Sequence, residues 1–183
     1  MAKKKARGKR PAKSKKFEPV LKEFHTVTPY LAINGAAEAV EWYKKAFGAK
    51  EVEREMEPGS GKLIHARLKI GDSIIMLSDV FPGAKHKDPR ELGGASVTLH
   101  IYSTDVDMLW KSAVEAGAKV DMQLDNMFWG ERYGQLTDPF GHSWSLSMRI
   151  PMSAEEMERK RQEAMQMFAQ GQHPGYDEST QTE

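Results

Sequence analysis

The sequence FWGERYGQLTDPFGHSWSL, residues 128–146, carries two tight-turn signals and one alternating strand within a short span. Asp138-Pro139-Phe140-Gly141 predicts a reverse turn, because Pro presets φ at the second position and Gly tolerates the positive φ that closes the turn. The next residues, 143–148, alternate serines with large apolar side chains. This pattern predicts a strand with one face in a core and the other face in a wetter environment.

The rest of the chain predicts a strand, a helix and three further strands, and then the same order again. In the first series Ala36, Val40, Tyr43 and Phe47 form the apolar stripe of an amphipathic helix, with Asn34 as its expected N-cap. In the second series Thr104 is the expected cap. The expected strands are 28–33, 50–56, 63–70 and 73–78, then 96–103, 119–124, 133–137 and 143–149, and residues 80–95 read as a loop.

Two short matches show that the series is an internal repeat. FGAK at 47–50 coincides with AGAK at 116–119 at a shift of 69, and GDS at 71–73 coincides with GHS at 141–143 at a shift of 70. Both matches fall at equivalent points of the predicted order. Two βαβββ units of equal length are therefore expected.

The stretch 128–146, together with GAAEAVEWYKKAFGA at 35–49, resembles the vicinal oxygen chelate superfamily, and in particular its PhnB-like branch. That superfamily holds glyoxalase, bleomycin-resistance and dioxygenase proteins. The resemblance covers about residues 27–150 and implies an α+β fold in which two βαβββ units, about 27–80 and 96–150, form one domain. It also implies a homodimer with pockets near the junction of units.

Composition and charge limit where the protein can act and what its N-terminal arm can contact. The chain has no cysteine and no apolar run long enough for a membrane span, so a cytoplasmic protein without membrane contact is expected. Residues 3–16 carry nine Lys or Arg and no acid; because the whole chain is +1, residues 17–183 sum to −8. The arm 1–16 either makes weak nucleic-acid contacts or is an unstructured tail. After the domain at 17–150, a capping box at 153–156 predicts a C-terminal helix, followed by a tail to 183.

Strand alternation predicts which side chains face a pocket. The interpretation leaves open whether the two histidines among them bind a ligand oxygen, shuttle a proton or are hydrogen-bonded structural residues. The aromatic side chains either line a pocket for a flat or cationic ligand or pack in an interface, and the arginines bind an anionic ligand or form salt bridges. The candidate ligand-binding residues are Tyr30, His65, Arg67, Met76, His100, Tyr102, Trp129, Arg132 and Ser145.

The metal-dependent members of the superfamily use His and Glu ligands on four pocket-facing strands. Counted from the landmarks of this sequence, the resemblance places those ligand positions at Thr28, Met76, Thr98 and Ser145. A thioether and three hydroxyls are poor ligands for divalent Zn, Ni, Mn or Fe. We therefore expect no cofactor and no resident metal.

The favoured function is metal-free binding of a small organic ligand. The alternative is a glyoxalase-like lyase or isomerase, or a dioxygenase-type enzyme, acting on a carbonyl compound; His65 and His100 are the weak catalytic candidates for general acid–base catalysis. A third hypothesis is a nucleic-acid-associated protein that uses the basic arm.

Overall fold

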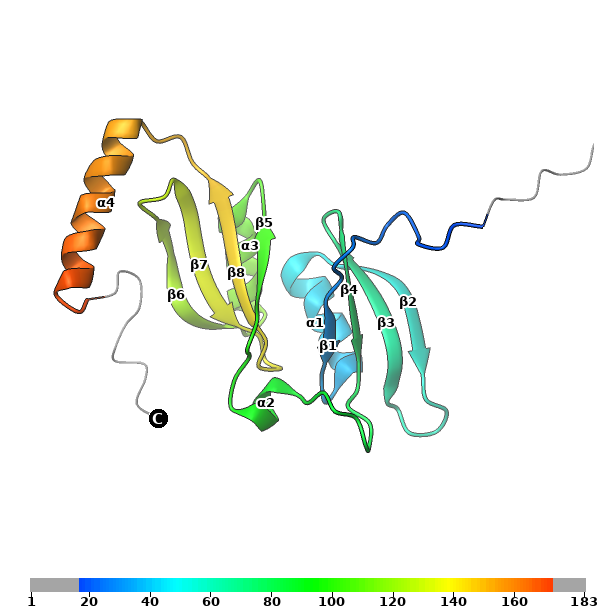
Figure 1. Ribbon diagram of the computed structural model, residues 1–183. Helices are drawn as coiled ribbons and strands as arrows, with labels where there is room; N and C mark the ends of the chain where they lie inside the picture. The colour runs from blue at the N-terminus through cyan, green and yellow to red at the C-terminus, as the bar shows by residue number, and fades with distance from the viewer. Residues whose placement is uncertain (1–16, 173–183) are drawn as a thin grey trace, which may run out of the picture.

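A computed structural model describes residues 17–172 and shows two βαβββ modules followed by a long helix (Figure 1). The expected arm at 1–16 and the tail from 173 lie outside the described residues. The first module is β1 (Tyr30–Ala32), α1 (Ala36–Phe47), β2 (Lys50–Met56), β3 (Leu63–Ile70) and β4 (Ser73–Ser78). The second is β5 (Thr98–Tyr102), α3 (Val106–Glu115), β6 (Lys119–Asn126), β7 (Glu131–Thr137) and β8 (Ser143–Arg149). Helix α2 (Pro89–Leu92) lies between the modules, and α4 (Ala154–Ala169) follows the second.

Each module forms a four-stranded mixed sheet with the same topology. The first sheet has the order β1-β4-β3-β2 and the second has the order β5-β8-β7-β6. In both, the first strand of the module pairs parallel with the last, and the other neighbours are antiparallel. The predicted repeat of two βαβββ units is therefore confirmed, and β1 and β5 lie at equivalent edges.

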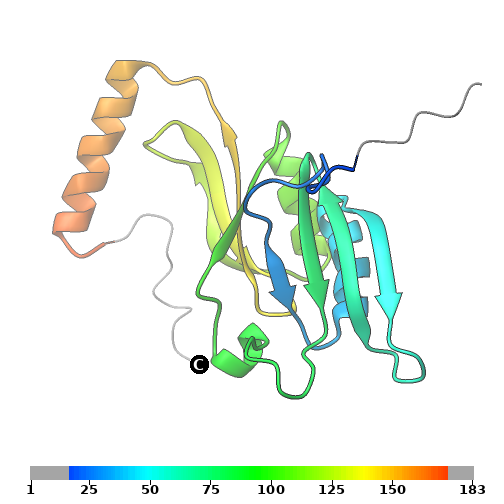
Figure 2. The same ribbon diagram turned by 45° about the vertical axis from the view of Figure 1, so that its right-hand side comes forward.

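The helices α1 and α3 contact each other and join the two modules through one continuous core. Figures 1 and 2 show both helices in the layer between the two sheets. The predicted stripe of α1 is buried in full, and the buried ring of Trp144 lies 4.7 Å from the ring of Phe47, centroid to centroid. Burial of these large rings supplies much of the hydrophobic stabilisation that holds the modules together.

The predicted turn at Asp138 forms and also supplies a polar connection inside this core. Gly141, with φ of +87°, closes the turn, and the backbone NH groups of Phe140 and His142 donate to the Asp138 carboxylate. The same carboxylate accepts from the Tyr43 hydroxyl at 2.6 Å and from Trp144 Nε1 at 2.8 Å. Burial, followed by the charge of Asp138, raises the pKa of Tyr43, so its phenol stays protonated and donates across the module boundary.

The predicted caps of α1 and α3 were wrong. Asn34 does not cap α1, because its backbone NH donates to Asp88 at 2.7 Å and its side chain donates to Glu91. Gly35 is the N-cap residue, and the buried Asp79, just after β4, accepts from the NH groups at the start of the helix. Helix α3 is capped by Asp105 rather than Thr104, since the Asp105 carboxylate accepts from the NH of Met108.

The predicted alternation holds in the strand interiors and fails at strand ends. Alternation counted back from the buried Ala66 and Leu68 predicts that Ile64 packs and Leu63 does not. Instead Leu63 is buried and Ile64 is 41% exposed, because the ladder with β2 shifts register between His65 and Leu63. Alternation over 96–103 predicts that Val97 packs, but it precedes β5 and is exposed. Alternation over 73–78 predicts that Ile74 faces the pocket, but it is buried. The predicted loop 80–95 contains the single turn of α2.

Helix α4 begins at the predicted capping box, where the Ser153 hydroxyl accepts from the NH of Glu156. It lies beside the second sheet, and Ala164 is its one buried residue (Figure 1). The methionines Met157, Met165 and Met167 and the ring of Phe168 stay more than one third exposed. Within residues 17–172, no helix combines the length and apolar character needed to cross a membrane.

Candidate functional site

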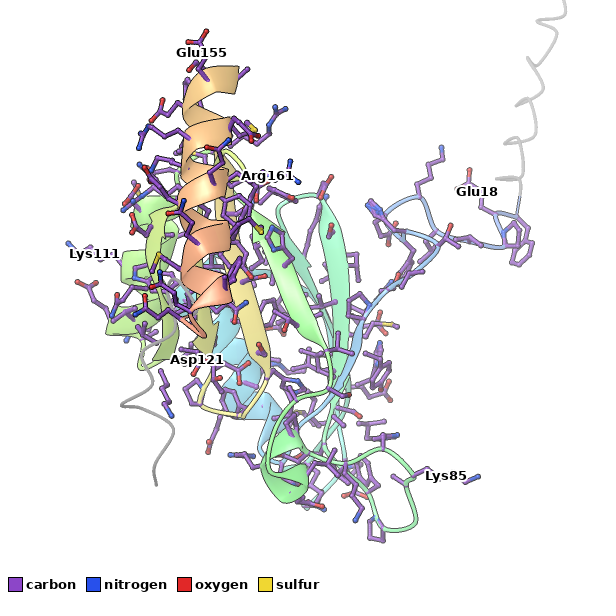
Figure 3. The ribbon with its side chains drawn as sticks, turned by 60° about the vertical axis from the view of Figure 1, so that its left-hand side comes forward. Glu18, Lys85, Lys111, Asp121, Glu155 and Arg161 are labelled. Atoms are coloured by element: carbon purple, nitrogen blue, oxygen red, sulfur yellow. The ribbon has the colours of Figure 1, made fainter. Side chains whose placement is uncertain are left out.

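Each sheet has one face that packs against its helix and one face that no helix of its own module covers, here called the open face. Because α1 and α3 lie between the sheets, the two open faces point outward in different directions (Figures 1 and 2). Figure 3 shows α4 on the open-face side of the second sheet. The predicted pocket residues are therefore divided between two surfaces of one chain rather than gathered in one cavity.

The open face of the first sheet carries charge pairs. Arg67 pairs with Glu53 of β2 and lies 3.6 Å from Glu23, and its guanidinium lies over the ring of Phe24. Next to it, the Tyr30 hydroxyl lies 3.4 Å from His65 Nδ1. Met76 shares this face, since it pairs with both Tyr30 and Arg67 in the sheet ladders. The structure thus brings Tyr30, His65, Arg67 and Met76 together, with Arg67 already paired to carboxylates.

The open face of the second sheet is built on a histidine held by two serines. His100 Nδ1 lies 2.7 Å from Ser145 Oγ, and His100 Nε2 lies 3.1 Å from Ser147 Oγ. Both serines are buried under the ring. Burial lowers the pKa of His100, and the charge of Glu131 only partly opposes this shift. The imidazole is therefore held neutral at pH 7, with both ring nitrogens hydrogen-bonded.

Aromatic side chains surround this histidine. The ring of Tyr102 lies 4.4 Å from that of His100, and the ring of Tyr133 lies 5.9 Å away on the other side and nearly parallel to it. Trp129 meets Tyr133 at 5.5 Å with an angle of 74° between the ring planes. Glu131 accepts from the Tyr102 hydroxyl at 3.3 Å and from Trp129 Nε1 at 3.2 Å. These contacts bring the predicted residues His100, Tyr102, Trp129 and Ser145 into one cluster.

Arg132 does not belong to this cluster, which corrects its assignment from sequence. Its guanidinium donates in a bidentate manner to Asp107 on α3, at 2.6 to 2.9 Å. Strand β7 alternates, so Arg132 lies on the helix-packed face while its neighbours Glu131 and Tyr133 lie on the open face. The salt-bridge alternative is the one that the structure shows.

Sequence reasoning missed Tyr133, Glu131 and Gln135 of β7. Their signal was present in the alternation ERYGQLT, in which Gly134 and Leu136 are the packed positions. The bulky Trp110 of α3 fills the space above Gly134, where a Cβ atom would lie 2.6 Å from the indole. The alternation was not recognised because Gly134 occupies a packed position where a large apolar residue is usual.

The four positions at which the superfamily's metal ligands were expected hold donors that do not suit a divalent cation. Three are hydroxyls already hydrogen-bonded within the chain: Thr28 to the His25 carbonyl, Thr98 to Ser143, and Ser145 to His100. The fourth is the thioether of Met76. Within residues 17–172, no three His, Asp or Glu side chains converge closely enough to hold a metal. The donor set does not fit a resident divalent metal, and metal independence stays a prediction.

A groove of about 780 Å³ separates the modules along the edge strand β5. Its lining includes Val27, Ile70, Ile74 and Leu109 and also His100 and Tyr102. The groove therefore adjoins the cluster on the second open face. Strands β1 and β5 each have a sheet partner on one side alone within the described chain.

Comparison with known proteins settles the family. A model of the Glyoxalase/Bleomycin resistance protein/Dioxygenase superfamily matches residues 24–146. The chain belongs to this superfamily. The uncharacterized protein Rv0887c of Mycobacterium tuberculosis is 45% identical over 127 residues, which cover 68% of this chain and 74% of that protein.

Solved structures show the same fold. TioX from Micromonospora sp. ML1 is 25% identical with a TM-score of 0.54, over 67% of this chain and 97% of its own. The PhnB protein from Bacillus cereus, named as a putative 3-demethylubiquinone-9 3-methyltransferase, is 20% identical with a TM-score of 0.53, over 68% and 99% of the two chains. These neighbours are matched almost in full, and the family model ends before α4 begins.

Proposed function

We propose that the protein binds a small organic ligand on the open face of its second sheet, without a metal. The observation that carries this proposal is the cluster of Tyr102, His100, Tyr133 and Trp129, which is aromatic, hydrogen-bonded and partly exposed. Rigid aromatic walls with a few fixed polar groups are typical of small-molecule sites. The cysteine-free composition supports a cytoplasmic setting.

A second copy of the chain completes the site in this proposal. The open faces diverge in one chain, β1 and β5 each have a free edge, and the edge of β5 lines the groove. Free edges with exposed apolar neighbours, such as Val27 and Val97, favour association with another chain. A homodimer would cover these edges and could set the first open face of one copy opposite the second open face of the other. Light scattering coupled to size-exclusion chromatography measures the molar mass in solution and so tests whether the chain forms a dimer.

The enzyme alternative rests on His65 and His100 and has less support. A lyase or isomerase acting on a carbonyl compound needs a group that takes and returns a proton. Both nitrogens of His100 are already engaged by Ser145 and Ser147, so proton transfer would first break one of these hydrogen bonds. The third hypothesis rests on residues 1–16, which lie outside the described residues; unchanged DNA affinity after their deletion would exclude it.

The proposal is tested by thermal-shift screening with neutral, cationic and anionic aromatic compounds, followed by calorimetry of the hits. Tyr102→Ala is the test variant, because this side chain is 67% exposed and its loss should leave stability within about 0.5 kcal/mol. We expect it to weaken ligand binding about tenfold, since one aromatic wall is lost. Arg132→Gln is the matched control and should bind as the wild type does. Equal binding by both variants, or no hits, would overturn the proposal.

A further inference from the structure

We propose that Trp129, Tyr133, Tyr102 and Glu131, here called the aromatic corner, bind an organic cation such as an alkylated ammonium group. This inference rests on the proposed function and names the chemical class of the ligand. All four side chains lie at one end of the second open face, where β7 begins and β5 ends.

The ring geometry suits a cation. Trp129 and Tyr133 meet nearly at right angles, with their centroids 5.5 Å apart, so the two ring faces can form adjacent walls. Tyr102 approaches from β5, on the far side of the buried Ser147 of β8, which pairs with both tyrosines in the ladders. An organic cation is attracted to the negative faces of such rings, and several rings around one position form the aromatic cage that binds alkylated ammonium groups.

The carboxylate of Glu131 supplies a full negative charge at the same place. Its two oxygens accept from the Tyr102 hydroxyl and from Trp129 Nε1, which orients both rings around it. Arg149 lies opposite Glu131 in the β7–β8 ladder, yet the carboxylate bonds to the two aromatic residues instead. A lone carboxylate with three rings is a poor metal site, because a divalent cation needs several charged or carbonyl ligands. The same carboxylate repels anions.

The fixed cation beside the corner is Arg149, the exposed ladder partner of Glu131 on β8, whereas His100 adds no charge. Burial keeps the pKa of His100 low, so the imidazole stacked on Tyr133 is neutral at pH 7. Outside the arm at 1–16 the chain sums to −8, which favours approach of a cation at low ionic strength. The Cε of Met157 on α4 lies 3.3 Å from the place of a Cβ on Gly130, the residue between Trp129 and Glu131. A polarisable thioether suits the methyl groups of an alkylated ammonium.

The test compares choline with its neutral isostere, 3,3-dimethylbutan-1-ol, in saturation-transfer NMR and calorimetry with the full chain. The two probes have the same shape, so a preference for choline isolates the charge. We expect choline to bind about tenfold more tightly. Equal affinity for both probes, or no binding of choline, would overturn the inference.

Two variants locate the effect. Glu131→Gln removes the charge and keeps the shape, so it should lower the affinity for choline about tenfold and leave that for the neutral isostere unchanged. Trp129→Leu removes one wall and should weaken choline binding to a similar degree. Glu115→Gln, an exposed acid on α3, is the control for net charge. A loss of choline binding in Glu115→Gln equal to that in Glu131→Gln would assign the effect to long-range charge and contradict the inference.

Failure of this inference is distinguishable from failure of the proposed function. If neutral aromatic compounds bind in a Tyr102-dependent manner and choline does not, the second open face is a ligand site of another chemistry. If no compound of any charge binds, the proposed function itself fails. Binding of choline that Glu131→Gln and Trp129→Leu leave unchanged places the cation elsewhere on the chain.

Discussion

The two modules share one topology and differ on their open faces. The first sheet exposes ion pairs, with Arg67 held by Glu53 and Glu23, whereas the second exposes the rings around His100. The packed faces remain similar, since in each module a small residue, Ala66 or Gly134, pairs with a buried leucine on the last strand. The internal faces of the repeat are held by packing in a common core, whereas the open faces are free to acquire different chemistry.

The largest expected effect is on the junction between the modules. Asp138→Ala leaves the buried Tyr43 hydroxyl, Trp144 Nε1 and two backbone NH groups without their acceptor. We expect a loss of about 3–5 kcal/mol in the free energy of unfolding, measured by urea titration. Because the core is continuous, both modules should unfold in one transition. Asp121→Ala, which removes a single part-buried hydrogen bond that Thr137 donates, is the control. Two separate transitions in the wild type would show that the modules are independent.

A smaller effect sharpens the comparison of the packed faces. Gly134→Ala would place a Cβ atom 2.6 Å from Trp110 and 2.9 Å from the Cα of Leu124, and the backbone atom cannot rotate away. We expect a loss of about 1–3 kcal/mol in thermal or urea unfolding. Ala66→Gly at the matching place of the first module should cost about 1 kcal/mol, mainly through backbone entropy. A neutral Gly134→Ala would mean that the indole of Trp110 is not fixed in this position.

The smallest effect concerns pH and the second open face. Burial lowers the pKa of His100 below 6.5 in the folded chain, so the unfolded chain binds more protons between the two pKa values. The contribution of neutral His100 to stability is therefore fully present above about pH 6.5 and is lost as the pH drops through the pKa of His100 in the folded chain. Burial also lowers the pKa of His142, so this histidine adds to the loss of stability at low pH. His100→Asn should reduce the difference in unfolding midpoint between pH 7 and pH 5, whereas His86→Asn, on the exposed loop, should not. A steeper fall in His100→Asn would contradict the assignment.

The repeat, the burial of the α1 stripe and the turn at Asp138 were predictable from sequence, because each depends on local spacing or on Gly and Pro. The cap of α1 was not predictable, since Asp79 lies 44 positions after the Gly35 NH that it accepts from, and the Asn34 NH donates to Asp88. Alternation placed His100, Tyr102 and Ser145 on one face correctly. It could not show that the two open faces diverge, because that depends on how α1 packs against α3.

The hydrogen bond between Tyr43 and Asp138 joins residues 95 positions apart in different units, so neither unit completes this part of the core alone. A protein of one βαβββ unit would expose the helix face that carries Trp42, Tyr43 and Phe47 to water. Such a surface is stable only when covered by another unit. A single unit would therefore need a second one to cover this face, and the chain supplies that second unit itself.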